Sequence, residues 1–334
     1  MSLDDIGMND AIVRIPEFLA RTDSRADAFE GAISVAPSEV LVIGGSIAAH
    51  ATEFVNACLG ETLRVPVSAF APSLTPDRVG PSTVVIVVAT TSADEQVLDV
   101  ARVAAGRGAP VVVLHRDGTT LDLTGLPGAL RLALPSVPRS RLSLYAVVAE
   151  LLRVLEVAKV AQGTGAMLDA AAERARARTV GPFAYATFGD TYARRLGRTF
   201  PLLVGAPGVG LAAARWWQAA IAANSRRFAH AESTAEYHAA LLAGFGQSGD
   251  VTRQVATLVL LRSGFDPPEA ASVFDAIEEW LSEAVADVLT IDAEGPCSLA
   301  QLIDLAVLGE LTSMSLAAAE GIDPGPAPLI DEEE

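Results

Sequence analysis

Two short polar segments follow apolar strands near the start of the chain, and each could bind an anion. The first, Gly44-Gly45-Ser46, comes directly after the apolar run 40–43 and opens a helix-length segment. A glycine turn between a strand and a helix presents backbone N–H groups and the positive end of the helix dipole to a ligand. Such turns also serve merely to start a helix, so these residues alone leave both interpretations open.

The second polar segment, residues 90–96, reads Thr-Thr-Ser-Ala-Asp-Glu-Gln and follows the apolar run 84–89. The hydroxyl groups of Thr91 and Ser92 could donate hydrogen bonds to a phosphate. The same residues could instead cap a helix that begins near Ala93, whose first turn would be stabilised by the two carboxylates after it.

An arginine stands in a third position that suits anion chemistry. Arg139 follows Pro138 and precedes a long apolar segment. A guanidinium is permanently charged and can bond two oxygens at once, so it can stabilise negative charge that develops on a substrate. A plain surface arginine, like the neighbouring Arg141, is the alternative.

The sequence predicts neither a metal nor a cofactor. Histidines at 50, 115, 230 and 238 share no ligand spacing with one another or with the two cysteines. The glycine turn at 205–210 lacks a phosphate-loop pattern, and Pro207 removes one amide donor that such a loop uses.

Strands that alternate with helices must position these residues, because β-branched runs separated by helix-length segments are typical of parallel sheets. In the first half we expect an amphipathic opening helix within 5–33, strands at 40–44, 63–70, 83–90, 110–115 and 130–134, and helices at 46–59, 93–107 and 142–160. After a helix at 167–178, the plan repeats with strands at 200–205, 254–261 and 287–291 and helices at 209–224, 235–244, 267–286 and 298–320. The predicted fold is α/β, with two doubly wound parallel-sheet domains.

Composition narrows the class of partner. The chain has 334 residues, 51% of them hydrophobic, and a net charge of −17. This charge argues against nucleic acid, whose phosphates require a basic face. The longest apolar runs of the sequence are too short to span a bilayer, and no secretory leader is evident, so we expect a cytoplasmic protein and no membrane partner. The arginine and alanine bias indicates a GC-rich bacterial genome.

The strand and turn at 40–46, Pro138-Arg139 and the ending Gly321-Ile322-Asp323-Pro324-Gly325-Pro326 together resemble the two-domain sugar isomerase (SIS) proteins of the bifunctional phosphoglucose/phosphomannose isomerase type. The resemblance implies two SIS-type, flavodoxin-like domains at 1–160 and 191–334, joined by a helical linker at 161–190. It also implies a sugar-phosphate ligand, a role in carbohydrate metabolism and a homodimer.

The resemblance assigns roles to the residues already singled out. Gly44, Gly45 and Ser46 would belong to the sugar-phosphate site. Either Thr91 or Ser92 would match the serine of the family's second phosphate loop, Ser-Gly-Asn-Thr-Glu. Arg139 would match the arginine beside the developing enediolate, and is a candidate catalytic residue.

Three family positions hold residues that cannot do the family's chemistry. The glutamate that moves the proton between C1 and C2 falls on Ala222 or Ala223, although Asn224 keeps part of the pattern. The threonine of the second phosphate loop becomes a carboxylate, Asp94 or Glu95, and the terminal lysine becomes Glu334.

Two residues on a later segment are alternative catalytic candidates. His238 occupies roughly the place of the family histidine that helps open the sugar ring, but lacks the Asn-Glu that follows it in the family. Glu236 could substitute as the base, and Glu232 is a weaker candidate of the same kind.

Three functions follow in order of preference. The first is a diverged protein that binds a sugar phosphate or related carbohydrate with weak or lost isomerase activity, since a general base contributes ~10²–10⁴-fold in rate. The second is an active aldose–ketose isomerase with a relocated base. The third is a structural or regulatory dimer without a small ligand.

Overall fold

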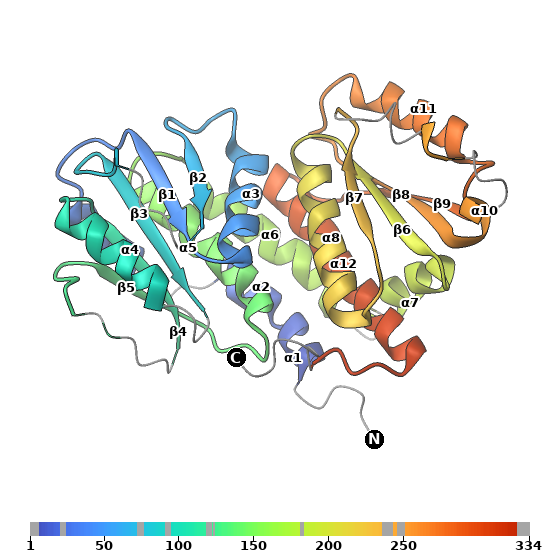
Figure 1. Ribbon diagram of the computed structural model, residues 1–334, viewed down its shortest axis with the longest axis horizontal. Helices are drawn as coiled ribbons and strands as arrows, with labels where there is room; N and C mark the ends of the chain where they lie inside the picture. The colour runs from blue at the N-terminus through green and yellow to red at the C-terminus, as the bar shows by residue number, and fades with distance from the viewer. Residues whose placement is uncertain are drawn as a thin grey trace. The chain divides into compact units, whose positions relative to one another are not determined.

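The structure is a computed structural model that describes residues 7–20, 25–71, 77–90, 95–117, 122, 124–180, 184–235, 243–245 and 251–325. Contacts divide these residues into two compact units. Residues 17–169 form the N-terminal unit, and residues 170–325 together with 7–16 form the C-terminal unit. Each unit is one parallel sheet with helices on both faces, as Figure 1 shows.

The N-terminal unit contains a five-stranded sheet in the order β2-β1-β3-β4-β5. Along the chain its elements are η1 (Ala26–Ala32), β1 (Glu39–Ile43), α3 (Ser46–Leu59), β2 (Val67–Phe70), β3 (Thr83–Ala89), α4 (Glu95–Gly106), β4 (Val111–Arg116), β5 (Leu130–Leu134), η2 (Ser140–Ser143) and α5 (Leu144–Val157). Every residue of β3 is buried, as expected of a central parallel strand that is covered on both faces.

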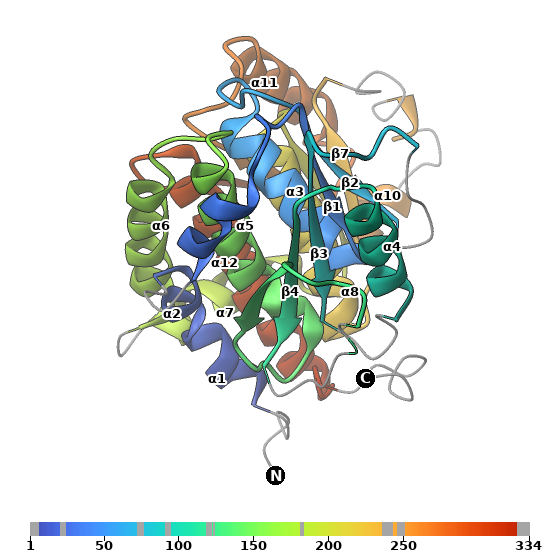
Figure 2. The ribbon, with the colours of Figure 1, turned by 90° about the vertical axis from the view of Figure 1, so that its left-hand side faces the viewer.

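Alternate residues of these strands pack against different helices. Leu41 and Val85 point to one face and form a cluster with Val97 and Leu98 of α4. Helices α3 and α5, which pack against each other, lie on the opposite face (Figure 2). The first strand is thereby fixed between two layers, and so is the turn that follows it.

The C-terminal unit repeats this plan with a four-stranded sheet in the order β7-β6-β8-β9. Its elements are α1 (Met8–Val13), α6 (Thr164–Thr179), which starts in the other unit, α7 (Ala184–Leu196), β6 (Phe200–Gly205), α8 (Val209–Ser225), β7 (His230–Ser233), α10 (Val251–Val255), β8 (Ala256–Arg262), α11 (Ala270–Leu281), β9 (Asp287–Asp292) and α12 (Ser298–Glu320). Helix α11 packs on one face of the sheet, and α8 and α12 lie on the other.

Helix α12 is the central helix of this unit. Among the described residues it alone is long and apolar enough to span a bilayer by length and composition, yet 89% of its most apolar window is buried inside the protein. It packs against α7 and α8, and the indole N–H of Trp217 on α8 donates to the carbonyl of Leu305 at 2.6 Å. Its hydrophobicity is therefore accounted for by its place in the core.

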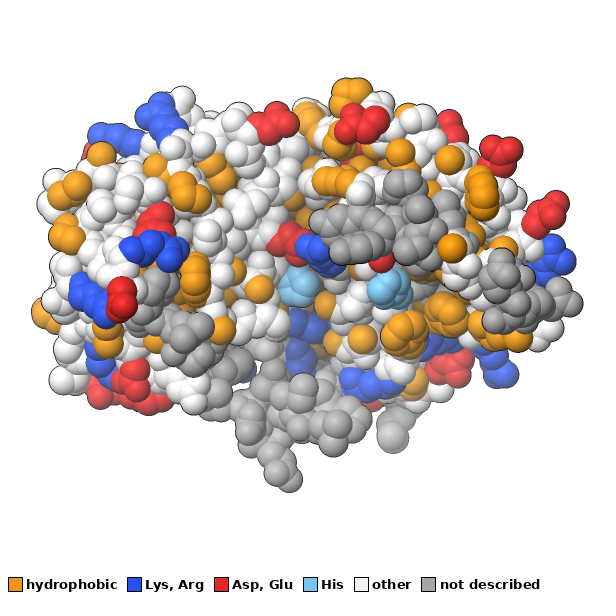
Figure 3. Space-filling model, turned by 45° about the horizontal axis from the view of Figure 1, so that its top comes forward, with side chains coloured by type: hydrophobic (Ala, Val, Ile, Leu, Met, Phe, Trp, Pro, Cys, Tyr) orange, Lys and Arg blue, Asp and Glu red, His pale blue; other side chains and the backbone are white. Residues whose placement is uncertain are grey.

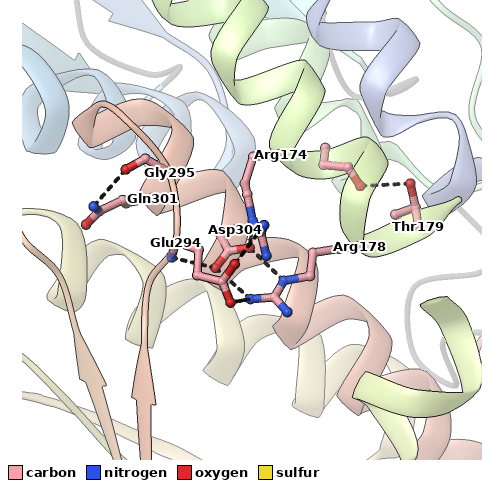
Figure 4. A network of polar contacts seen from close by, with 8 residues as sticks. Arg174, Arg178, Thr179, Glu294, Gly295, Gln301 and Asp304 are labelled. Atoms are coloured by element: carbon pink, nitrogen blue, oxygen red, sulfur yellow. Dashed lines mark hydrogen bonds and ion pairs between the residues drawn. The ribbon is translucent and has the colours of Figure 1, made fainter. Parts of the chain in front are cut away.

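A buried ion cluster joins α6 to α12, as Figure 4 shows. The carboxylate of Asp304 on α12 is fully buried and accepts hydrogen bonds from Arg174 and from Arg178, the latter at 2.7 and 3.0 Å. Glu294 pairs with both arginines, at 2.9 Å from Arg174 and 3.2 Å from Arg178. Burial alone would lower the pKa of Arg178, but the hydrogen bonds and charge of Asp304, with the charge of Glu294, outweigh it and raise that pKa.

The two predicted doubly wound sheets are confirmed, and most element bounds agree within a few residues. The prediction of a single opening helix within 5–33 was wrong. The described part of this segment holds α1, α2 (Ile15–Leu19) and the 3₁₀ helix η1. Pro16 explains the first interruption, because it has no N–H to continue the hydrogen bonding of α1.

Two strands also differ from the predictions. The strand expected at 63–70 begins only after Pro66, at Val67, since proline cannot donate to a ladder. The short edge strand β7 was missed, because its four residues are too few for a clear alternation. The helix expected at 235–244 lies largely outside the described residues.

We predict that Asp304→Asn lowers the free energy of unfolding by about 3–5 kcal/mol, because two arginines then lack their buried counter-charge. Asp287→Asn is the matched control, since Asp287 forms a bidentate pair with Arg195 on the surface. Its loss should cost at most ~1 kcal/mol. Urea unfolding measures both, and equal midpoint shifts would show that the cluster around Asp304 contributes no more than a surface pair.

Candidate functional site

The turn after β1 is closed on one side and open on the other. Gly44 is buried, and a Cβ atom there would lie 2.9 Å from both the Val88 carbonyl oxygen and the Ala48 Cβ. Gly44 is therefore required by packing against β3 and α3. Gly45 and Ser46 are exposed, and a Cβ atom on Gly45 would meet nothing within 4 Å. A ligand can thus approach the backbone at Gly45.

The N-terminus of α3 lacks a side-chain cap and has no acidic residue in its first turn. Its N-cap residue is Gly45, whose carbonyl accepts the first helical hydrogen bond, from the Ala49 N–H at 3.3 Å. An α-helix leaves its first N–H groups without partners in the helix, and these groups attract an anion. The turn predicted from the sequence as an anion site therefore has the local geometry for one.

The segment after β3 lies beside this turn, because β1 and β3 are parallel neighbours with Ile43 opposite Val87. Thr90 is described there and is buried, whereas Thr91 and Ser92 lie outside the described residues. Of the two acids that could replace the family threonine, Asp94 also lies outside the described residues. Glu95 begins α4.

Glu95 is the first residue of α4, the helix that follows this segment. It is 3.2 Å from Arg102 on the same helix, and Arg102 also pairs with Asp99 at 2.6 Å. These hydrogen bonds and charges outweigh desolvation and raise the pKa of Arg102. Glu95 is therefore already paired with a cation of α4.

Arg139 lies in the connection between β5 and α5, directly before the 3₁₀ turn η2. Its backbone is extended, its carbonyl accepts the Leu142 N–H at 3.0 Å, and its side chain is half-buried. The turn η2 packs against α3, the helix that Ser46 opens. The fold thus brings the segment that starts at Arg139 to the helix that carries the anion turn, while a shared cleft stays a prediction.

The positions of the family base lie on the outer side of α8. Ala222 is exposed and Ala223 is half-buried, so neither alanine is required by close packing. The next residue, Asn224, is fully buried and donates to Ser313 at 2.8 Å and to Glu310 at 3.4 Å, both on α12. Asn224 therefore joins α8 to α12.

Glu310 was not singled out from the sequence. Its carboxylate is fully buried in the centre of α12, in a run that is otherwise mostly apolar. A buried carboxylate needs polar partners, and the Asn224 amide is one of them, while Ser313 donates to the backbone carbonyl of Glu310 at 2.8 Å. An acid inside so apolar a helix is the signal that could have revealed this cluster.

Of the other catalytic candidates, only Glu232 lies within the described residues. His238 and Glu236 lie outside the described residues. Glu232 sits on the edge strand β7, where its carboxylate accepts the Ser233 N–H at 2.9 Å and lies 3.5 Å from His230. Within the described ranges, no group of three His, Cys, Asp or Glu residues could hold a metal ion.

The C-terminal unit has an equivalent turn after β6, where two glycines allow close contacts between backbone segments. A Cβ atom on Gly205 would lie 2.1 Å from the Gly210 backbone, and one on Gly210 would lie 2.7 Å from the Leu261 carbonyl oxygen. The start of α8 is therefore pressed against β6 and β8. Gly205 and Gly210 are therefore required by close packing of α8 on its sheet, as Gly44 is in the other unit.

The loop after β8 contains a partly buried acid, Asp266. The Asp266 carboxylate accepts the Ser263 N–H at 2.8 Å through one oxygen, while the other oxygen is buried with no hydrogen-bond partner in the described part of the chain. Burial raises the pKa of Asp266 to about 6, although the Ser263 N–H and the charge of Arg262 act in the opposite direction. Asp266 is consequently costly to ionise.

We predict that the Asp266→Asn variant becomes progressively more stable than the unchanged protein as the pH rises. The folded-state pKa of about 6 exceeds the unfolded value of 3.8, so ionisation destabilises the fold increasingly across that window. Between pH 5 and pH 8 the stability advantage of the variant should grow by up to ~1 kcal/mol, after the partial exposure of the side chain is allowed for.

Urea unfolding at the two pH values measures this difference. Asp275→Asn is the matched control, because Asp275 is an exposed acid 3.5 Å from the same Arg262. The same pH response in both variants would contradict the assignment of the effect to burial of Asp266.

Residues 188–333 match the model of the bacterial phospho-glucose isomerase C-terminal SIS domain. No curated protein matches the chain by sequence.

Solved structures match over nearly the whole length. A candidate phosphosugar isomerase from Clostridium difficile 630 aligns with a TM-score of 0.71 and 13% identity, covering 97% of each chain. One from Silicibacter pomeroyi DSS-3 aligns with a TM-score of 0.70 and 18% identity, covering 95% of this chain and 99% of that one. The tagatose-6-phosphate ketose/aldose isomerase of Escherichia coli aligns with a TM-score of 0.69 and 14% identity, covering 97% and 94%. At these identities the structural likeness establishes the fold alone, and residues 188–333 are similar to the C-terminal SIS domain of bacterial phospho-glucose isomerases.

Proposed function

We propose that this protein is a diverged relative of the phosphoglucose/phosphomannose isomerases that binds a sugar phosphate or related carbohydrate and has weak or no isomerase activity. The observation that carries the proposal is the pairing of an open, uncapped helix N-terminus at Gly45-Ser46 with alanine at both positions available to the family base. The first can hold a phosphate, and the second removes proton transfer.

Further features support a small polar ligand. Two of the structural relatives are named as phosphosugar isomerases, and the third is a tagatose-6-phosphate ketose/aldose isomerase. On the described residues of the face in Figure 3, basic side chains stand in small groups among acidic and apolar ones, which does not suit a nucleic-acid backbone. By the same resemblance we propose a cytoplasmic homodimer, with domains at 1–160 and 191–334 and a helical linker at 161–190.

The sugar-phosphate site that we propose comprises Gly44, Gly45 and Ser46, with Thr91 or Ser92 on the neighbouring loop. Arg139 would neutralise charge on the ligand, because its segment packs against the same helix. His238 and Glu236 remain the residues that could restore proton transfer if activity is found.

We predict no measurable conversion of fructose 6-phosphate to glucose 6-phosphate or mannose 6-phosphate. The loss of a general base slows such a reaction by ~10²–10⁴-fold. A coupled assay that reads both products measures this, with an active phosphoglucose isomerase as the positive control. A turnover of several per second would overturn the proposal, and its loss in Glu236→Gln would identify the relocated base.

We predict that Ser46→Asp abolishes fructose 6-phosphate binding without unfolding the protein. The new carboxylate would repel a phosphate at the α3 N-terminus by ~4 kcal/mol per unit charge at 4 Å, while it complements the helix dipole by ~0.3–1 kcal/mol. Isothermal titration calorimetry should show at least a tenfold weaker affinity.

Ser272→Asp is the matched control, because it makes the same change at an exposed position in the first turn of α11, in the other unit. It should leave binding within about twofold, because it lies outside the site that we propose. Equal losses in both variants would show a general charge effect and contradict a phosphate site at Ser46.

A further inference from the structure

Three segments of the N-terminal unit enclose a cavity of about 560 Å³. Residues 30–37 lead into β1, residues 64–65 precede β2, and residues 157–160 end α5. Because β1 and β2 are parallel, the cavity lies at the amino end of the sheet. The proposed sugar-phosphate site lies at the opposite, carboxyl end and shares no residue with it. We call this cavity the amino-end pocket.

Aliphatic side chains form most of the wall of the amino-end pocket. Val160 is buried, Ile33, Val65 and Val157 are half-buried, and Val35 is 46% exposed. None of the described residues that line the pocket is aromatic, so the wall offers no ring on which a flat ligand could stack. A concave wall of this kind favours a ligand with an aliphatic body.

One arginine at the pocket has an unused side chain. Arg64 is exposed, and its guanidinium makes no hydrogen bond or ion pair with the described residues. Its backbone is nevertheless fixed, because the Arg64 N–H donates to the Val160 carbonyl at 3.2 Å. The guanidinium therefore keeps its donors for a ligand, and it can bind both oxygens of a carboxylate at once.

The only lysine of the chain, Lys159, also lines the pocket. Its φ of 59° lies in the left-handed region, where the end of a helix usually has glycine. A cation near the end of α5 complements the helix dipole, but a residue of the last turn with ordinary φ would do the same. The unfavourable backbone at Lys159 is therefore an indication that its amino group has a use at this place.

The ion pair of Lys159 is weak. Its Nζ lies 3.8 Å from the Glu30 carboxylate, and the two side chains are 77% and 71% exposed. Exposed pairs of this kind contribute little, because water screens both charges. Lys159 can therefore add positive potential for an anion that Arg64 binds.

We propose that the amino-end pocket binds an aliphatic monocarboxylate, with the carboxylate on Arg64 beside Lys159 and the hydrocarbon chain against the valines of the wall. One unused guanidinium, with Glu30 nearby, suits a single negative charge. The aliphatic wall suits a hydrocarbon chain better than the hydroxyl groups of a sugar. This site goes beyond the proposed sugar-phosphate binding and does not depend on it.

The test is isothermal titration calorimetry of the full chain with octanoate, below the concentration at which octanoate forms micelles. Acetate and octanol are the comparison compounds, because acetate lacks the chain and octanol lacks the charge. Octanoate should bind, and each comparison compound should bind at least about tenfold more weakly. Absence of octanoate binding, or equal affinity for octanoate and octanol, would overturn the proposal.

Two pairs of variants locate the site. Arg64→Gln should weaken octanoate binding by about tenfold or more, whereas Arg131→Gln, which removes the same charge from an exposed position on β5, should leave it within about twofold. Val35→Ser should weaken it by about threefold or more. Its control is Val103→Ser on α4, because Val103 is 45% exposed. Octanoate binding that survives both pocket variants would place the ligand elsewhere and reject the pocket.

The single lysine gives a second readout of position. Reductive methylation with isotope-labelled formaldehyde labels only Lys159 and the amino terminus and keeps their charge, and Lys159→Arg assigns the lysine signal. Octanoate should shift this signal in NMR spectra with the affinity that calorimetry gives. A signal that stays unshifted at saturating octanoate would contradict a carboxylate beside Lys159.

A contact between two copies of the chain is the competing use of the apolar wall. Sedimentation velocity with and without Val35→Ser tests it. A dimer that this variant dissociates, together with absence of octanoate binding, would assign the wall to that contact and reject the carboxylate as its ligand.

Discussion

The buried carboxylate of Asp304 is the constraint on which the C-terminal unit depends. A fully buried charge is unfavourable unless it is paired and hydrogen-bonded, and here Arg174 and Arg178 do both. The two arginines lie four residues apart, so they stand on one face of α6. Asp304 therefore fixes the rotation of both helices, and α6 holds α12, which contacts α7 and α8, in place.

Strong local patterns made much of the fold predictable from the sequence. The run at 83–89 is buried on both faces, and α3 begins and ends as the glycine turn and periodicity indicate. The edge strand β7 was missed because its identity depends on pairing with β6, which the four residues do not encode. Proline chemistry explains the other errors, since Pro16 and Pro66 interrupt patterns that hydrophobicity alone continues.

The candidate site was predictable only where chemistry lies within one segment. Gly44-Gly45-Ser46 is such a segment: its expected place between a strand and a helix is observed, and ligand binding there stays a proposal. Glu310 was missed because its partner Asn224 lies on another helix, so no spacing within one segment reveals the pair.

Both units contain a strand followed by a turn and a helix, but the glycines of the turn differ in the two units. After β1, only Gly44 is needed for packing, and Gly45 leaves the backbone open beside uncapped N–H groups. After β6, Gly205 and Gly210 bring the backbone of α8 into close contact with β6 and β8. Pro207 also lacks an N–H in that turn. The turn therefore leaves the backbone open at Gly45 in one unit, where we propose an anion site, and holds α8 close to its sheet in the other unit.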